Sequence, residues 1–171
     1  MTKRSLRYAL GISPHTGWAA CVVAGGTLAR PEIIANQVIR YATDAERFCY
    51  HAAAEMDLAA AEKWIAKVRR DAVANAQRLL EPLLAGADIC AIVAKDRDPG
   101  TLEHILAAHP RIHTAEGCFH RDVLREACTI PVRLIPPNSL DPTQVGKLAS
   151  PPWGQPQKIA ALAAWAVLAE H

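Results

Sequence analysis

The sequence lacks the features that mark a membrane protein or a disulfide-stabilised one. No apolar run reaches the ~18 uncharged residues that a membrane-spanning helix needs. The five cysteines are odd in number and include no C-x-x-C pair, so they predict neither a disulfide framework nor a cysteine-based metal site. No signal peptide is recognised. We therefore expect reduced cysteines in a cytoplasmic protein with no membrane partner.

An excess of charge of one sign is lacking as well. The 19 Lys and Arg and 17 Asp and Glu residues give a net charge of +2, which neither reveals nor excludes a nucleic-acid-binding face. Basic residues gather at two places, which are Lys3, Arg4 and Arg7, and then Lys63, Lys67, Arg69 and Arg70. Such groups are more often solvated edges or helix faces than phosphate-binding tracks. With 51% hydrophobic residues, the composition predicts one ordinary globular domain over residues 1–171.

Three strand patterns are present near the start, at residues 7–13, 17–24 and 32–41. Gly25 and Gly26 follow the second pattern and can adopt the positive φ angles of a tight hairpin turn. The third strand has its expected apolar face at Ile34 and Val38. Three consecutive strands with short connections predict an antiparallel meander.

Helix and strand patterns alternate along the rest of the chain. Residues 44–56 are interpreted as a loop that can hold helical turns, and Asp57 is the expected N-cap of a long amphipathic helix to about Leu84. The later elements are expected to be a buried strand at 89–94, a helix at 101–108 stopped by Pro110, a helix capped by Thr114 and reaching about Cys128, a strand at 132–135, and an apolar helix from Gln155 onward. The predicted fold class is α/β, with a mixed five-stranded sheet (the antiparallel meander plus two parallel strands) flanked by helices.

This order of elements is similar to that of the RNase H-like superfamily. The segment L-G-I-S-P-H-T-G-W-A, from Leu10, resembles the start of the RuvC-type Holliday-junction resolvases, in which a strand ends in G-I-D-P-G. The segment Q-K-I-A-A-L-A-A-W, from Gln157, resembles their last helix, in which an acidic residue precedes an Ala-rich run. The whole chain is more similar still to a group of uncharacterised bacterial proteins of this fold, which carry related H-A-A-A-E, I-H-T-A-E-G and P-P-W-x-Q-x-Q-K segments, here at His51, Ile112 and Pro151.

The resemblance implies a nuclease whose metal ligands are missing. RNase H-like nucleases use carboxylates to hold two divalent ions that activate water and stabilise the leaving oxygen. The resemblance places Ser13 and Lys95 at the positions of two of these acids, with Asp96 and Asp98 just beyond Lys95. It places either Gln157 or Lys158 at the position of the acid on the last helix. It therefore implies a degenerate nuclease that has lost the two-metal site. The candidate ligand-binding residues at the carboxyl edge of the sheet are Ser13, His15, Lys95, Asp96, Gln157 and Lys158. A purely structural turn is the alternative interpretation of Ser13 and His15.

Two groups of histidine and glutamate are the candidates for catalysis. His113, Glu116 and His120 lie at helical spacings of three and four, and His51 and Glu55 would share a face if their segment is helical. A carboxylate can orient and tune a neighbouring imidazole for acid–base work, and such a set can also ligate zinc. The structural alternative is that Glu116 favours the positive end of a helix and that His120 belongs to a solvated face.

Three functions remain open from the sequence. The first is binding of nucleic acid or another phosphate-containing ligand by a degenerate nuclease. The second is an enzyme that uses the histidine and glutamate groups in the same cleft. The third is a homodimer that acts as an interaction protein, with its Ala-rich helices as contact faces. The sequence assigns no cofactor and no bound metal, and it leaves open whether the protein is an enzyme.

Overall fold

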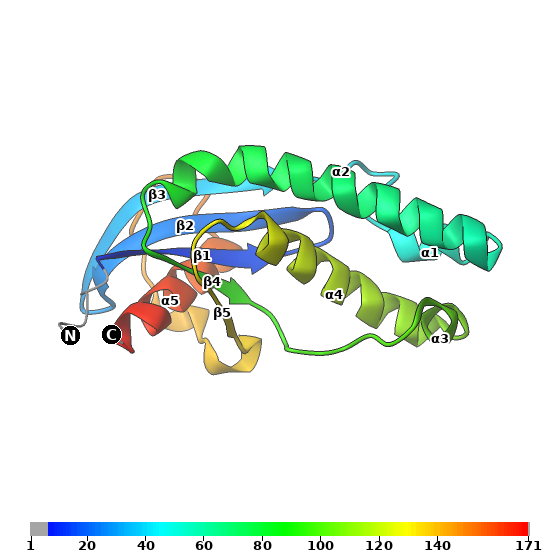
Figure 1. The fold of residues 1–171 in the computed structure, drawn as a ribbon. Coiled ribbons are helices and arrows are strands. Elements are labelled where there is room, and N and C mark those ends of the chain that lie inside the picture. Colours follow the sequence, from blue (N-terminus) through cyan, green and yellow to red (C-terminus); the bar gives the residue numbers. More distant parts are fainter. Residues whose placement is uncertain (1–6, 171) are drawn as a thin grey trace, which may run out of the picture.

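Five strands form one mixed sheet in the order β3-β2-β1-β4-β5 (Figure 1). The computed structural model describes residues 7–170, so Lys3 and Arg4 of the first basic group lie outside the described residues. The strands are β1 (Tyr8–Pro14), β2 (Trp18–Thr27), β3 (Arg30–Arg40), β4 (Ile89–Val93) and β5 (Val132–Ile135). The β1–β2 and β2–β3 pairs are antiparallel, whereas the β1–β4 and β4–β5 pairs are parallel. The predicted sheet is therefore confirmed.

Helices cover both faces of this sheet. They are α1 (Cys49–Ala53), α2 (Leu58–Leu84), α3 (Leu102–Leu106), α4 (His109–Ala127) and α5 (Gln155–Ala169). One face packs against α2 and α4 through a core that includes Leu10, Ile12 and Leu80, and the other packs against α5. Figure 1 shows that α2 and α4 extend past the ends of β1 and β4, with α1 and α3 at their far ends. Within residues 7–170, no helix is long and apolar enough to cross a membrane.

Local sequence signals account for the ends of several elements. Asp57 caps α2 as predicted, because its Oδ1 accepts a hydrogen bond of 2.9 Å from the Ala60 N–H. Pro82 lies in the last turn of α2, which continues to Leu84. Gly11 allows α5 to lie directly on β1, since a Cβ at this position would overlap the Ala160 carbonyl oxygen.

Two predictions about the meander are wrong. Gly25 and Gly26 belong to β2, and the hairpin turn lies at residues 28–29. Gly26 does have a positive φ of 68°, but there it brings the backbone close to the Arg30 carbonyl. Ile34 is 51% exposed because it is the extra residue of a β-bulge, which lies between the residues of β3 that pair with Val23 and Ala24. The bulge changes the alternation of the strand, so the fully buried apolar side chain of β3 is Ile39.

The start of α4 is also earlier than predicted. The helix begins at His109, with Pro110 in its first turn, where the missing N–H of proline costs nothing. Thr114 is therefore no cap but an interior residue, whose hydroxyl donates to the Pro110 carbonyl at 3.2 Å. This earlier start adds a full helical turn to the face that carries His113 and Glu116.

Candidate functional site

The carboxyl ends of β1 and β4 meet at one edge of the sheet. These strands are parallel, so Ser13 near the end of β1 and Lys95 just after β4 lie at the same edge. Open α/β sheets place their ligands at such an edge. Ser13 is buried, whereas Lys95 and Asp96 are exposed.

Helix α5 brings its first turn to the same edge. The Ala160 carbonyl lies against Gly11, and the Trp165 indole N–H donates to the Gly25 carbonyl beside the start of β1. The helix therefore runs antiparallel to β1, which places Gln157 near the Ser13 end. Gln157 is 4% exposed, and its side-chain oxygen accepts a hydrogen bond of 2.9 Å from the Gly154 N–H. Its side chain thus caps α5.

A hollow of about 260 Å³ opens between this edge and α4. Its walls are formed by Pro14, Val93, Ala94, Lys95, Arg97, His113, Thr114, Gly117, Cys118 and Arg121. Three of these residues are cationic, and no Asp or Glu is among them. Burial raises the pKa of the Cys118 thiol, which disfavours a thiolate nucleophile in the hollow.

Arg121 fixes the segment that follows β4. This side chain is 6% exposed, and its Nη1 donates to the Lys95 and Arg97 carbonyls, each at 2.9 Å. Its Nε and Nη2 contact the two carboxylate oxygens of Asp122 at 2.8 and 3.1 Å. The hydrogen bond to Asp122 raises the pKa of Arg121, which stays charged. The guanidinium therefore positions Lys95 and Arg97 at the hollow, while the Asp122 carboxylate balances the positive charge of Arg121.

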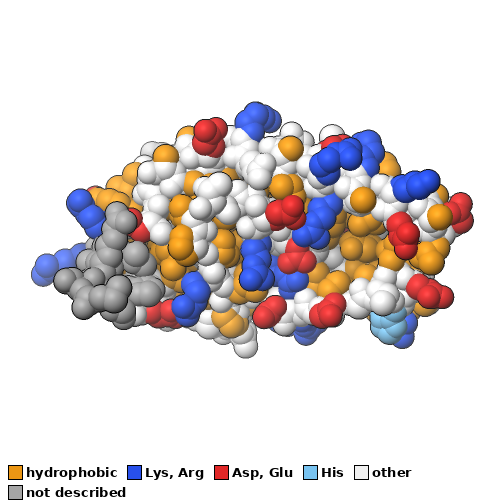
Figure 2. All heavy atoms as spheres, viewed as in Figure 1, with side chains coloured by type: hydrophobic (Ala, Val, Ile, Leu, Met, Phe, Trp, Pro, Cys, Tyr) orange, Lys and Arg blue, Asp and Glu red, His pale blue; other side chains and the backbone are white. Residues whose placement is uncertain are grey.

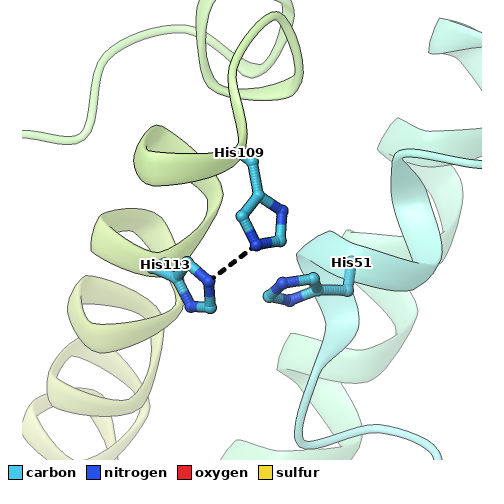
Figure 3. A group of neighbouring side chains, drawn as sticks. All are labelled: His51, His109 and His113. Atoms are coloured by element: carbon cyan, nitrogen blue, oxygen red, sulfur yellow. Dashed lines mark hydrogen bonds between the residues drawn. The ribbon is translucent and has the colours of Figure 1, made fainter.

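Three histidines meet where α1 lies against the start of α4 (Figure 3). His109 and His113 occupy successive turns of α4, with their Nε2 atoms 2.9 Å apart. His51 faces them from α1, with ring centroids 5.1 Å from His109 and 4.8 Å from His113. One ring nitrogen from each of the three lies within 4.8 Å of the other two. Within residues 7–170, no other group of three His, Cys, Asp or Glu residues has this geometry.

Glu116 holds His51 in this cluster. The carboxylate is 4% exposed, and its Oε1 accepts from His51 Nδ1 at 2.8 Å and from the His51 backbone N–H at 3.3 Å. Burial and the charge of Glu116 together raise the pKa of Cys49 to about 12. The structure thus brings His51, His113 and Glu116 together from the two predicted groups.

Glu55 and His120 do not join this cluster. Glu55 is exposed and follows the end of α1, so it does not share a helical face with His51 as expected. His109, which was not singled out in the sequence, takes part instead. It forms an i, i+4 pair with His113, but the pair is recognisable only if the helix begins before Thr114.

His120 is buried and is not part of a solvated face. It is 2% exposed, and both ring nitrogens are bonded. The Nε2 atom lies 2.9 Å from the Arg47 carbonyl, and Nδ1 lies 3.4 Å from the Gly17 N–H and 3.1 Å from the Tyr41 hydroxyl. Burial lowers the pKa of His120, so the ring is neutral near pH 7.

His15 lies in the turn after β1. Its ring stacks on Trp18 with centroids 3.9 Å apart, and its backbone N–H donates to the Trp18 carbonyl at 2.8 Å. Burial lowers the pKa of His15. These contacts agree with the turn interpretation of His15.

The sequence matches no model of a known protein family and none of the curated proteins. The structure is similar to that of Thermus thermophilus RuvC in complex with a Holliday junction substrate, with a TM-score of 0.52 and 11% identity over 96% of this chain and 94% of that chain. A second structure of Thermus thermophilus RuvC has a TM-score of 0.46 and 14% identity over 92% of this chain and 91% of that one. The chain has an RNase H-like fold.

The second basic group lies on α2, and none of its residues lines the hollow beside the carboxyl edge of this RNase H-like sheet. On α2, Lys67 contacts Asp71 at 2.9 Å and Arg70 contacts the same carboxylate at 3.3 Å. Arg69 pairs with Glu126 of α4 at 2.9 Å. Figure 2 shows basic and acidic side chains intermingled on this face of the molecule. The group is thus a solvated face with its charges largely paired, as the sequence favoured.

Proposed function

We propose that this RNase H-like protein binds nucleic acid through backbone phosphates at the hollow beside the carboxyl edge and lacks two-metal nuclease chemistry. The observation that carries the proposal is the composition of the hollow, whose walls hold the exposed cations Lys95 and Arg97 and no carboxylate. A phosphate needs cations and N–H donors, whereas a pair of Mg²⁺ ions needs several oxygen ligands.

The side chains at the three acid positions support the loss of the metal site. Ser13 is buried at the end of β1, and Lys95 adds a positive charge that would repel a divalent ion. Gln157 is engaged in capping α5. Asp96 is the remaining carboxylate among the candidates, and one exposed carboxylate does not hold two ions.

The fold adds a reason to choose nucleic acid as the phosphate ligand. The RuvC structure with the same fold is a complex with a Holliday junction substrate. Here, Lys95 and Arg97 are exposed, and Arg121 holds the backbone that carries them through hydrogen bonds to their carbonyls. We therefore expect the two residues to contact successive phosphates, with little preference for base sequence.

Fluorescence anisotropy with labelled junction, duplex and single-stranded DNA and RNA tests this function. The affinity of the wild type should fall steeply with salt, because binding releases counterions from the nucleic acid. Lys95→Gln and Arg97→Gln should each weaken binding and lower the slope of log K against log salt by about 1. Lys63→Gln removes the same charge from an exposed position on α2 and should leave binding unchanged. Absence of binding at low salt, or an equal effect of all three changes, would overturn the proposal.

A cleavage assay tests the chemistry separately. We expect junction DNA incubated with the protein and Mg²⁺ or Mn²⁺ to remain intact, because the oxygen ligands for two ions are missing. Metal-dependent cleavage by the wild type would show that the edge still forms a nuclease site. Binding without cleavage is the combined result that the proposal requires.

A further inference from the structure

We propose that His51, His109 and His113 form a binding site for one divalent transition-metal ion, with Zn²⁺ as the best fit, and that Glu116 positions His51 for it. The site is distinct from the carboxylate site of RNase H-like nucleases. It lies at the α1–α4 junction and uses nitrogen ligands. It does not depend on the proposed binding of nucleic acid.

The geometry of the three rings is close to that of a metal site. Zinc binds imidazole nitrogen at about 2.0–2.1 Å, so two tetrahedral ligand atoms lie about 3.4 Å apart. His109 and His113 already have their Nε2 atoms at 2.9 Å, and all three ligand nitrogens lie within 4.8 Å of one another. Small rotations of side chains would therefore complete the site. Figure 3 shows the rings directed toward one another from two separate helices.

The Glu116 carboxylate supplies the second observation. Metal-binding histidines usually donate their other ring N–H to a carboxylate or carbonyl, which fixes the tautomer and the ring orientation. A carboxylate accepts hydrogen bonds, so the 2.8 Å contact with Glu116 places the proton of a neutral His51 ring on Nδ1. The lone pair then remains on Nε2, the nitrogen available for a metal. A glutamate that is 4% exposed is costly to bury, and this orienting contact explains its presence.

The site would be accessible and only partly coordinated by the protein. His109 and His113 are exposed and His51 is half-buried, so an ion can enter from solvent without opening the core. Three imidazoles leave one tetrahedral position for water or an anion, as in zinc sites with three protein ligands. His113 also contributes to the wall of the basic hollow, so the open position would adjoin the proposed phosphate site.

Isothermal titration calorimetry of the chelator-treated protein with Zn²⁺ tests this site. The wild type should bind one ion per chain, and Co²⁺ in its place should give the visible absorption of a tetrahedral nitrogen-ligated ion. His109→Gln and His113→Gln remove a ligand, and Glu116→Gln removes the orienting charge. Loss of such an outer partner should lower metal affinity about 10–100-fold, and loss of a direct ligand should lower it at least as much.

His104→Gln is the matched control, because this exposed histidine on α3 lies outside the cluster. It should leave both stoichiometry and affinity unchanged. Circular dichroism of each variant checks folding, and His109→Gln keeps the test valid if Glu116→Gln does not fold, since His109 is exposed. The proposal is overturned if the wild type binds no Zn²⁺ at micromolar concentrations, or if His109→Gln and His113→Gln bind as tightly as His104→Gln.

Discussion

Replacing Arg121 with methionine tests how far the carboxyl edge depends on one buried guanidinium. The side chain donates to the Lys95 and Arg97 carbonyls at 2.9 Å and pairs with Asp122. Hydrogen bonds to charged groups contribute about 1.5–3 kcal/mol each. Residues 95 and 97 are exposed, so water can replace part of what their carbonyls lose. We therefore expect Arg121→Met to lower the free energy of unfolding by about 2–4 kcal/mol, with the two carbonyl bonds as the main contribution.

Urea denaturation followed by circular dichroism measures this loss. Arg121→Lys keeps the charge beside Asp122 but not the planar fork that spans two carbonyls and a carboxylate, so its loss should be intermediate. Arg125→Met changes an exposed arginine one turn later on α4 and should stay within about 0.5 kcal/mol of the wild type. If Arg121→Met also stays within that range, the segment after β4 is held by something other than Arg121.

Three further changes probe the fold around the site, each by urea denaturation. Gly11→Ala pushes a methyl group into the Ala160 carbonyl, so α5 must shift, and the expected loss is about 3 kcal/mol or more. Burial lowers the pKa of His120 below its usual 6.5. As the pH falls, His120 therefore binds a proton in the unfolded chain at a higher pH than in the folded chain. The wild type should then lose stability between about pH 7 and pH 5, and His120→Gln should flatten this dependence; equal slopes would contradict the assignment. Asp57→Ala removes the acceptor for the Ala60 N–H and should cost about 1 kcal/mol.

Elements with a strong local pattern were predictable from the sequence. All five residues of β4 are apolar and buried, and such a short continuous run is typical of a parallel strand covered on both faces. Asp57 marks the start of α2 because an aspartate side chain readily accepts a hydrogen bond from a free N–H group of the first helical turn. The apolar helix α5 is buried against the sheet, so it is not the exposed contact face that a homodimer through this helix would need. The homodimer itself stays a prediction.

The candidate site was less predictable, because it depends on helix boundaries and on contacts distant in sequence. The sequence favours Pro110 as a helix stop, although proline fits the first turn of a helix as well as the residues beyond its end. A helix stop at Pro110 would separate His109 from His113. The pairing of His51 with Glu116 joins residues 65 positions apart, and no local pattern reports it. His120 looked like part of a polar surface, since the sequence H-R-D gives no sign that its neighbours fold over it.

The buried polar residues of α4 hold neighbouring segments of the chain in place, a role that α5 does not share. Three of the five buried polar residues identified within residues 7–170 lie on α4, namely Glu116, His120 and Arg121. Each binds a different segment: Glu116 holds His51 of α1, His120 holds the loop at Arg47, and Arg121 holds the segment after β4. A buried polar group left without a partner costs about 1–3 kcal/mol, so a helix that only covered the sheet would be apolar here, as α5 is beyond its capping residue Gln157. Helix α4 therefore sets the positions of the segments around the carboxyl edge. The basic hollow and the histidine cluster both consist of groups held in place by this one helix.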